Sequence, residues 1–271
     1  MPRRPVANRW ILAIALLTAL CVAGCQTSAL GRRQFKMMSE EEMSQMGAAA
    51  FADISKQKPL SQEALTNAKV TCVANAITRI LTGIDTQNNW EVRVFADDTP
   101  NAFALPGGKI GVNTGLLKVA RTQGQLAAVI GHEITHVTQG HANERVSAEV
   151  AKNSALQVAA VVADASSPGW GQMVGLLGAG VEVGVMLPFG RKQETEADLV
   201  GLDLMAQAGF DPRESIALWQ NMSKAGGGQP PEFLSTHPAY GTRMRELEQR
   251  MPSAMRLYED AKAKGIAPRC Y

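Results

Sequence analysis

The sequence predicts an α+β fold that is mainly helical, with one small β-sheet and an exposed edge hairpin. Apolar residues recur at helical spacing through much of the 271-residue chain, whereas segment 90–95 alternates between apolar and charged residues as a strand does. A Pro-Gly-Gly turn divides segment 101–112 into two short strands. Apolar residues form 45% of the chain and charged residues 19%, so the chain can bury a core and general disorder is excluded.

The first residues have the pattern of a secretory signal. A positively charged start precedes an uncharged run, 10–23, that is too short to cross a bilayer comfortably. The run ends in Val22-Ala23-Gly24-Cys25, which resembles a bacterial lipobox and implies removal of 1–24 and lipidation of Cys25. Because Gln26 stands where an inner-membrane lipoprotein has Asp, the resemblance favours the periplasmic face of the outer membrane of a Gram-negative cell. An ordinary cleaved signal and a transmembrane anchor are the alternatives.

The rest of the chain is nearly neutral. The leader holds three of the 27 basic residues and none of the 25 acidic ones, so the mature chain has a net charge of −1. This balance provides no electrostatic footprint for nucleic acid, and that class of partner is excluded. Segment 25–38 is polar and irregular, which predicts a tether between the lipid and a domain formed by 39–271.

Capping and breaking residues place the helices of this domain. Ser39 and Glu42 form a capping box that begins a helix ending near residue 55. The Ala-, Val- and Gly-rich stretch 151–187 contains no uncharged span of 18 residues, so we expect a loose helical hairpin or lid, ending by 190, and no membrane segment. The remaining helical pieces are expected at 61–81, 116–117, 123–143 and 193–208, and from 211 and 242 onward.

The hairpin is expected to offer a free sheet edge. Asn101, Ala102 and Phe103 lie in or beside its first strand, and Gly107 and Gly108 lie in its turn. A proline next to the turn supports an edge position, because proline is tolerated in sheets chiefly at edges. An extended peptide can add to such an edge as a further strand.

Two cysteines remain once the leader and the lipid site are set aside. Cys72 and Cys270 lie near opposite ends of the domain, in a compartment that permits disulfides. We expect a bridge between them that ties the C-terminal tail to an early helix. Two unpaired thiols are the alternative.

The segment from His132 to His136 carries the strongest chemical signal in the chain. It reads His-Glu-x-x-His, and helical residues four apart share a face, so both imidazoles can hold one metal ion. Glu133 then lies where it can accept a proton from a water molecule at that metal. A solvated histidine pair on a helix surface is the alternative.

A third metal ligand is expected downstream. A metzincin would have Gly and His at the positions of Gln139 and Ala142, so that subclass is excluded. Glu194 and Asp198 share one face of a later helix, where Glu194 can coordinate the metal and Asp198 can orient a ligand imidazole. A helix with ordinary surface acids is the alternative. Glu196, two residues off that face, is expected at the surface, and His141 is expected to be a surface or helix-capping histidine.

Several motifs in a fixed order resemble metallopeptidase family 48, the HtpX and CAAX prenyl protease type that includes periplasmic outer-membrane lipoproteins. The resemblance covers roughly 39–248 and includes the edge hairpin, His-Glu-x-x-His, Glu194 to Asp198, and His237-Pro238 with Arg243. It implies a gluzincin-type active-site helix beside a small sheet. It also implies that His237 either stabilises the oxyanion or occupies the open metal position, and that Arg243 pairs with a carboxylate or with substrate. A helix-capping histidine and a surface arginine are the alternatives.

Together these observations predict a zinc-dependent endopeptidase with one zinc ion per chain. By resemblance, its partners are unfolded or misassembled envelope proteins, which it would degrade in quality control. A lipoprotein chaperone or assembly factor with a latent zinc site is the alternative, and a purely structural lipoprotein is a third reading.

Overall fold

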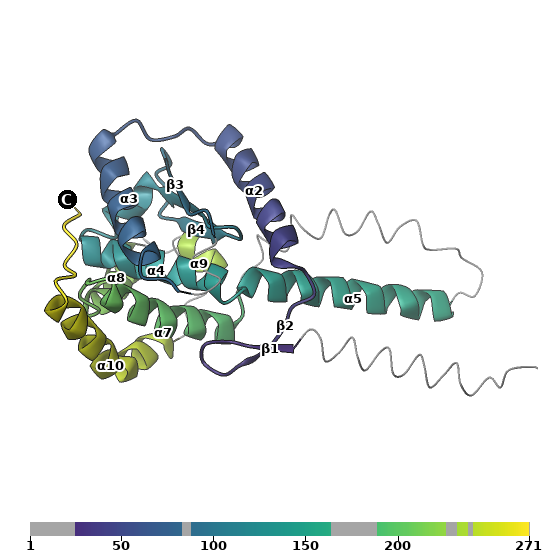
Figure 1. Cartoon of the computed structure of the whole chain (residues 1–271). Helices are drawn as coiled ribbons and strands as arrows, with labels where there is room; N and C mark the ends of the chain where they lie inside the picture. The colour runs from purple at the N-terminus through teal and green to yellow at the C-terminus, as the bar shows by residue number, and fades with distance from the viewer. Residues whose placement is uncertain (1–24, 83–87, 164–188, 226–231, 238–240, 271) are drawn as a thin grey trace, which may run out of the picture.

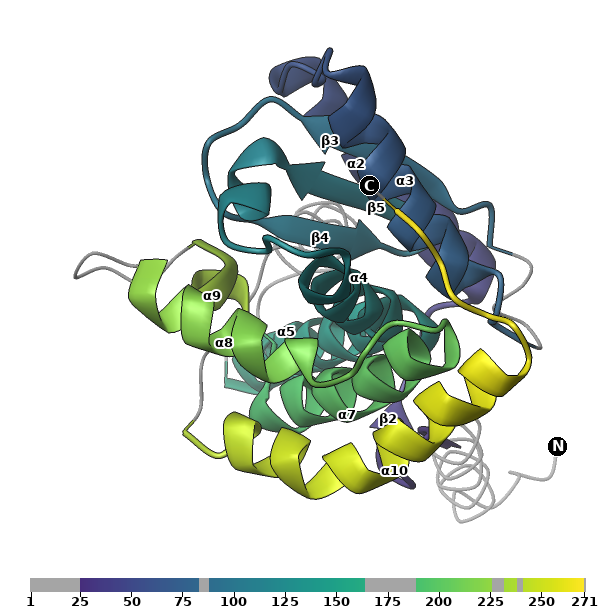
Figure 2. The ribbon, with the colours of Figure 1, turned by 90° about the vertical axis from the view of Figure 1, so that its left-hand side faces the viewer.

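The computed structural model describes residues 25–82, 88–163, 189–225, 232–237 and 241–270. Helix α4 (Gln123–Thr138) lies at the centre of the molecule (Figure 2). A three-stranded sheet and helix α3 lie on one side of it, and helices α7, α8 and α10 lie on the other. The expected mainly helical fold with a small sheet beside the active-site helix is confirmed.

The N-terminal segment is more ordered than the polar tether that we expected. Strands β1 (Cys25–Thr27) and β2 (Arg33–Phe35) pair antiparallel around a turn at Gly31. The hairpin lies beneath the beginning of α5 (His141–Ala163) (Figure 1). The Ala29 backbone N–H donates to the side chain of Gln139, which ties the hairpin to the end of α4. The predicted leader, 1–24, lies outside the described residues.

Two helices precede the sheet. Helix α2 (Glu40–Gln57) begins with the expected capping box, in which the Ser39 and Glu42 side chains each accept from the other residue's backbone N–H. Helix α3 (Ala64–Thr78) is shorter than the expected 61–81. The Ser61 backbone N–H donates to the Val94 carbonyl of strand β3 (Glu91–Phe95), so this part of the chain pairs with the sheet.

The sheet has the order β3-β5-β4. Central strand β5 (Lys109–Asn113) pairs parallel with β3 and antiparallel with β4 (Ala102–Leu105), so β4 is one of the two edge strands. Gly107 and Gly108 form the turn with φ of +77° and +78°, which only glycine adopts readily. The backbone geometry of the turn therefore explains why both positions are glycine.

The expected helix 123–143 is two helices. Gly140 has a φ of +64°, ends α4 and lets α5 leave in a new direction. Of the lid expected at 151–187, the first part continues α5, and 164–188 lie outside the described residues. The later helices are α7 (Arg191–Gln207), α8 (Glu214–Ala225), α9 (Glu232–Thr236) and α10 (Arg243–Ala263). In the part of the chain that the structure describes, no helix combines the length and hydropathy needed to cross a membrane.

Helices α4 and α7 approach most closely at two glycines. A Cβ on Gly131 would lie 2.9 Å from the Gly201 carbonyl oxygen, and a Cβ on Gly201 would lie 2.8 Å from the His132 backbone nitrogen. Any side chain at either position would separate the helices. This contact lies one residue before His132, so it sets the distance between the histidines of α4 and the carboxylates of α7.

A disulfide joins the two ends of the domain. Cys72 on α3 is bonded to Cys270 in the C-terminal tail, with the two Cα atoms 5.5 Å apart. Cys270 is buried in the same core cluster as the apolar residues of α3 and α4. The bridge closes a 198-residue separation in sequence, so it restricts the unfolded chain strongly.

Substituting Gly201→Ala is expected to lower the free energy of unfolding by about 1–3 kcal/mol, because the new methyl group overpacks the α4–α7 contact. Zinc affinity is expected to fall with it. Gly241→Ala is the matched control, because nothing lies within 4 Å of its Cβ position. Equal unfolding curves for the two variants would contradict the proposed role of the helix contact.

Peptide mapping without reduction is expected to recover the Cys72 and Cys270 peptides as one linked species. Cys270→Ser is expected to lower the free energy of unfolding by about 2–5 kcal/mol, because the unfolded chain gains conformational freedom. Separate peptides, together with a melting temperature that reduction leaves unchanged, would show that the two thiols are free in solution.

Candidate active site

Helix α4 places three functional side chains in the protein interior. His132, Glu133 and His136 are at most 4% exposed. The Nε2 atoms of His132 and His136 lie 3.0 Å apart, as expected for residues one helical turn apart. The alternative of a solvated histidine pair is therefore excluded.

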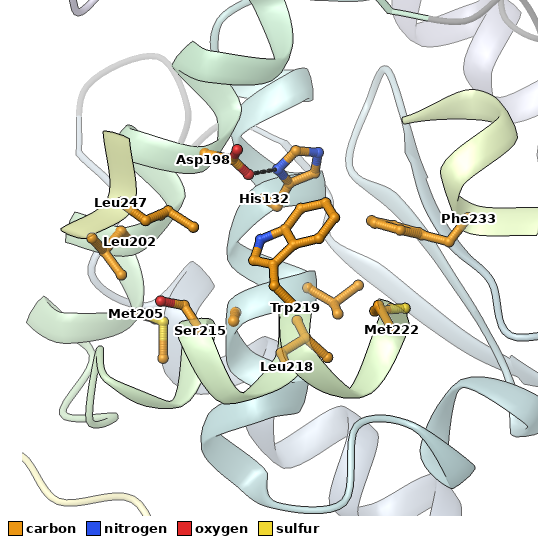
Figure 3. A pocket seen from close by; sticks show the side chains of 12 residues that line it. His132, Asp198, Leu202, Met205, Ser215, Leu218, Trp219, Met222, Phe233 and Leu247 are labelled. Atoms are coloured by element: carbon orange, nitrogen blue, oxygen red, sulfur yellow. Dashed lines mark hydrogen bonds and ion pairs between the residues drawn. The ribbon is translucent and has the colours of Figure 1, made fainter. Parts of the chain in front are cut away.

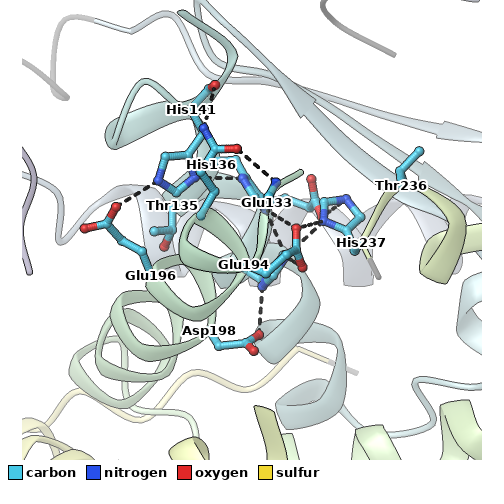
Figure 4. A network of polar contacts seen from close by, with 12 residues as sticks. Glu133, Thr135, His136, His141, Glu194, Glu196, Asp198, Thr236 and His237 are labelled. Atoms are coloured by element: carbon cyan, nitrogen blue, oxygen red, sulfur yellow. Dashed lines mark hydrogen bonds and ion pairs between the residues drawn. The ribbon is translucent and has the colours of Figure 1, made fainter. Parts of the chain in front are cut away.

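Helix α7 and the segment after α9 complete the cluster (Figure 4). Glu194 Oε2 lies 3.6 Å from His132 Nε2, and Glu194 Oε1 lies 3.5 Å from His136 Nε2. His237 Nδ1 lies 3.1 Å from both His132 Nε2 and Glu194 Oε1, and its Nε2 lies 3.2 Å from Glu133 Oε1. One candidate ligand atom from each of His132, His136, Glu194 and His237 lies within 4.8 Å of all the others. Pro238 of the expected His-Pro motif lies outside the described residues.

The outer side of His132 is held by a buried ion pair. Its Nδ1 lies 3.0 Å from Asp198 Oδ1, and Arg243 contacts both Asp198 oxygens at 2.6 and 2.7 Å. Arg243 Nη1 also lies 2.7 Å from Glu194 Oε2, and its guanidinium lies 4.2 Å from the centroid of the Trp219 ring. Apolar side chains of α7, α8 and α10 lie around Asp198 and His132 (Figure 3). Arg243 thus contacts two site carboxylates and is not a surface arginine.

The protonation of these groups fits a metal ion. Burial would by itself raise the pKa of Asp198, but the charge and hydrogen bonds of Arg243 lower it to about 2. A charged Asp198 accepts a hydrogen bond from the N–H at His132 Nδ1. The other ring nitrogen of His132, Nε2, then has a free lone pair. Burial lowers the pKa of His136 well below its usual value and that of His237 to about 3, so both rings are neutral.

His136, like His132, has its Nδ1 against a buried partner and its Nε2 toward the cluster. Its Nδ1 lies 2.8 Å from His141 Nδ1, and its Nε2 faces His132 Nε2. Two imidazole lone pairs that face each other at 3.0 Å repel unless a cation lies near both. The two imidazoles and the Glu194 carboxylate are ligand types that zinc prefers, so the cluster fits one zinc ion.

Burial also shifts the two carboxyl groups of the cluster. It raises the pKa of Glu133 to about 7, a rise that the nearby charge of Glu194 reinforces. It raises the pKa of Glu194 to about 7, against the opposing charge of Arg243. Both groups therefore titrate near neutrality in the absence of a cation, and a bound cation would favour their charged forms.

The edge strand lies directly beside Glu133. The Ala104 backbone N–H of β4 donates to Glu133 Oε2 at 3.1 Å. Next to it is a pocket with a cavity volume of about 190 Å³, lined in part by Ala104, Gly107, His136 and Phe189.

The residues expected at this edge differ in their placement. Ala102 is buried in β4 beside α4, and the Asn101 carbonyl accepts from the Asn113 backbone N–H. The Phe103 ring packs against Phe51 and Phe95, so it faces the core behind the sheet. The two turn glycines pack against α2 and Trp90. Of the expected edge residues, Gly107 alone lines the pocket, and the β4 group that hydrogen-bonds Glu133 is the backbone N–H of Ala104.

Two residues expected at the surface are buried beside the cluster. His141 is fully buried and Glu196 is 2% exposed, and their side chains are 3.1 Å apart. The prediction failed because it extended α4 through residue 143 and treated one face of α7 as solvent-exposed. The break at Gly140 turns His141 back toward His136, and the N-terminal hairpin covers the Glu196 face of α7.

Phe189 is a further neighbour of the cluster that the sequence did not reveal. Its ring stacks on His136 with the centroids 3.6 Å apart, and Arg145 Cζ lies 3.5 Å from the Phe189 centroid. No spacing rule relates Phe189 to the histidine motif, so the sequence holds no signal that could have identified it.

Comparison with known proteins matches residues 64–251 to peptidase family M48. The chain is 42% identical over 167 residues to the mitochondrial metalloendopeptidase OMA1 of Schizosaccharomyces pombe, which covers 61% of this chain and 48% of that protein. It is 32% identical over 239 residues to the human mitochondrial metalloendopeptidase OMA1, covering 85% and 45%. It is 31% identical over 161 residues to the beta-barrel assembly-enhancing protease of Escherichia coli, covering 57% and 33%. The chain spans about half the length of the two OMA1 relatives and a third of the bacterial one.

These relatives overturn one prediction. The expected location, lipid-anchored at Cys25 on the periplasmic face of a bacterial outer membrane, is wrong, because the fission yeast and human relatives are mitochondrial proteins by name. The prediction rested on a four-residue resemblance after a short apolar run. Such a resemblance is a weak signal beside similarity that extends over the whole domain.

The family match agrees with the geometry of the metal cluster. The family match covers more than half of the chain and includes both helices that carry the metal cluster. The relatives are metalloendopeptidases, and the buried cluster fits one zinc ion. The chain therefore belongs to peptidase family M48.

Proposed function

We propose that the protein cleaves extended segments of unfolded or misassembled proteins, with His132, His136 and Glu194 as the zinc ligands and Glu133 as the general base. The observation that carries this proposal is the hydrogen bond from Ala104 N–H to Glu133, because it brings a sheet edge, a base and the metal cluster together. The zinc ion would supply a Lewis acid that polarises the scissile carbonyl.

Glu133 is suited to move protons. Its carboxylate lies beside the metal cluster, where a bound cation would favour the charged form, and that form can accept a proton from the attacking water and donate it to the leaving amine. Its side chain is held between Ala104 N–H and His237 Nε2, so it faces the cluster from the side of the edge strand. The same position puts it within reach of a peptide carbonyl that lies along β4.

The edge strand supports the proposed preference for extended substrates. Strand β4 pairs with β5 on one side only, and its other edge faces the pocket beside His136. A peptide that adds to this edge is recognised through main-chain hydrogen bonds, which depend little on side-chain identity. Such a site selects for unfolded or misassembled segments, in keeping with a role in protein quality control.

His237 is proposed to act within the site. It lies against His132, Glu194 and Glu133 at 3.1 to 3.2 Å and is 2% exposed. From there its neutral ring can either occupy the open metal position or hydrogen-bond the oxyanion. The alternative of a helix-capping histidine leaves these contacts unexplained.

Glu133→Gln is expected to lower kcat on an unfolded protein substrate by about 10²–10⁴-fold with zinc content unchanged, because the amide cannot accept the proton. Glu149→Gln on α5, whose partner Lys152 is exposed, is the control and should cleave at the parental rate. Zinc content and single-turnover cleavage are measured together.

Two outcomes would count against the peptidase assignment of these residues. Undiminished cleavage by Glu133→Gln would remove Glu133 from the reaction. Full biological function of the inactive variant would favour the chaperone or assembly factor with a latent zinc site.

His237→Ala is expected to change kcat by about tenfold or more, equivalent to about 1.4 kcal/mol in the barrier. An increase identifies a histidine that blocks the metal position, and a decrease identifies a group that stabilises the oxyanion. Kinetics within about twofold of the parent, at unchanged zinc content, would return His237 to a structural role.

A further inference from the structure

A chain of three buried side chains, which ends at the half-buried Arg32, extends from the cluster away from the substrate side. His136 Nδ1 lies 2.8 Å from His141 Nδ1, and His141 Nε2 lies 3.1 Å from Glu196 Oε2. Glu196 Oε2 in turn accepts from Arg32 Nε at 3.2 Å and from Arg32 Nη2 at 2.9 Å. Figure 4 shows the three members of this chain nearest the cluster, on the opposite side of it from His237.

The protons of this chain have one arrangement. Glu196 Oε2 faces His141 Nε2, Arg32 Nε and Arg32 Nη2, and a guanidinium can only donate, so Glu196 is the acceptor in these contacts. His141 must then carry its proton on Nε2, and its Nδ1 is an acceptor. His136 must donate from Nδ1, which leaves its Nε2 lone pair directed at the cluster.

We propose that His141 and Glu196 are positioning residues that fix the tautomer and ring orientation of His136, and that Arg32 of the N-terminal hairpin anchors them. The arrangement parallels the one behind His132, where Asp198 contacts the imidazole directly and Arg243 holds Asp198. On the His136 side, a second imidazole extends the same connection to a carboxylate and an arginine. The inference rests on the proposed ligand set.

The N-terminal hairpin is held firmly enough to serve as an anchor. Arg32 also contacts both carboxylate oxygens of Glu144 at 2.5 and 2.7 Å. The Gln34 side chain donates to Glu144 and to the Gln139 carbonyl, and the Leu30 backbone N–H donates to Glu196. Residues 28–34 thus fasten α4, α5 and α7 together behind the histidines.

The test measures zinc affinity by competition with a chromogenic chelator. His141→Ala is expected to raise the zinc dissociation constant by about 10–100-fold, the usual effect of removing the outer partner of a ligand histidine. His141→Asn is expected to lie closer to the parent, because an amide oxygen can still accept the His136 proton. The Co²⁺-substituted protein should show an altered visible spectrum in His141→Ala.

A double-mutant cycle separates positioning from general stability. Glu196→Gln alone is expected to weaken zinc binding about tenfold, but to add less than about twofold in a His141→Ala background, because it acts through His141. Arg32→Ala should weaken zinc binding, whereas Arg213→Ala, which removes an exposed arginine paired with Asp211, should leave it unchanged. Melting of the zinc-free variants reports any loss of stability separately.

The outcomes distinguish the inference from the ligand assignment beneath it. If His136→Ala keeps parental zinc affinity, the ligand set is wrong. If His136→Ala loses zinc while His141→Ala and His141→Asn both retain parental affinity, only the positioning role fails. Equal effects of Glu196→Gln in both backgrounds would show that Glu196 acts independently of His141.

Discussion

The site depends on one constraint, which is that two imidazole nitrogens face each other at 3.0 Å inside the protein. This arrangement is unfavourable for the protein alone, because both Nε2 atoms direct lone pairs into a space that water does not screen. The protein imposes it by binding the opposite nitrogen of each ring, through Asp198 for His132 and through His141 for His136. A cation near both nitrogens relieves the repulsion, so the buried histidine pair suits a metal ion.

The helix packing that completes the cluster around this histidine pair depends on two glycines. At Gly131 and Gly201, α4 and α7 approach so closely that no side chain fits between them. The approach brings Glu194 within 3.6 Å of both histidines and places Asp198 behind His132. Arg243 on α10 contacts both carboxylates of α7. Its buried guanidinium therefore lies against their negative charge and holds α10 against α7.

Local patterns predicted much of this from the sequence. The capping box at Ser39, the hairpin glycines, and the spacings of His132 with His136 and of Glu194 with Asp198 are short-range signals with a geometric meaning. The structure places all four of these site residues in one buried cluster or directly behind it. What the sequence did not reveal depends on contacts between distant segments. His141 and Glu196 were assigned to the surface because a straight helix would direct His141 away from His136, and nothing local reveals that residues 28–34 cover Glu196.

The central claim, that buried partners set the histidine tautomers for one zinc ion, is tested most directly by nitrogen-15 NMR of the zinc-loaded protein. The chain has only four histidines, so each ring can be assigned by single substitution. We expect a proton on Nδ1 of both His132 and His136, with Nε2 of each ring bound to the metal. We expect His141 to carry its proton on Nε2 and to have an unprotonated Nδ1. A proton on His141 Nδ1, or metal coordination through His136 Nδ1, would contradict it.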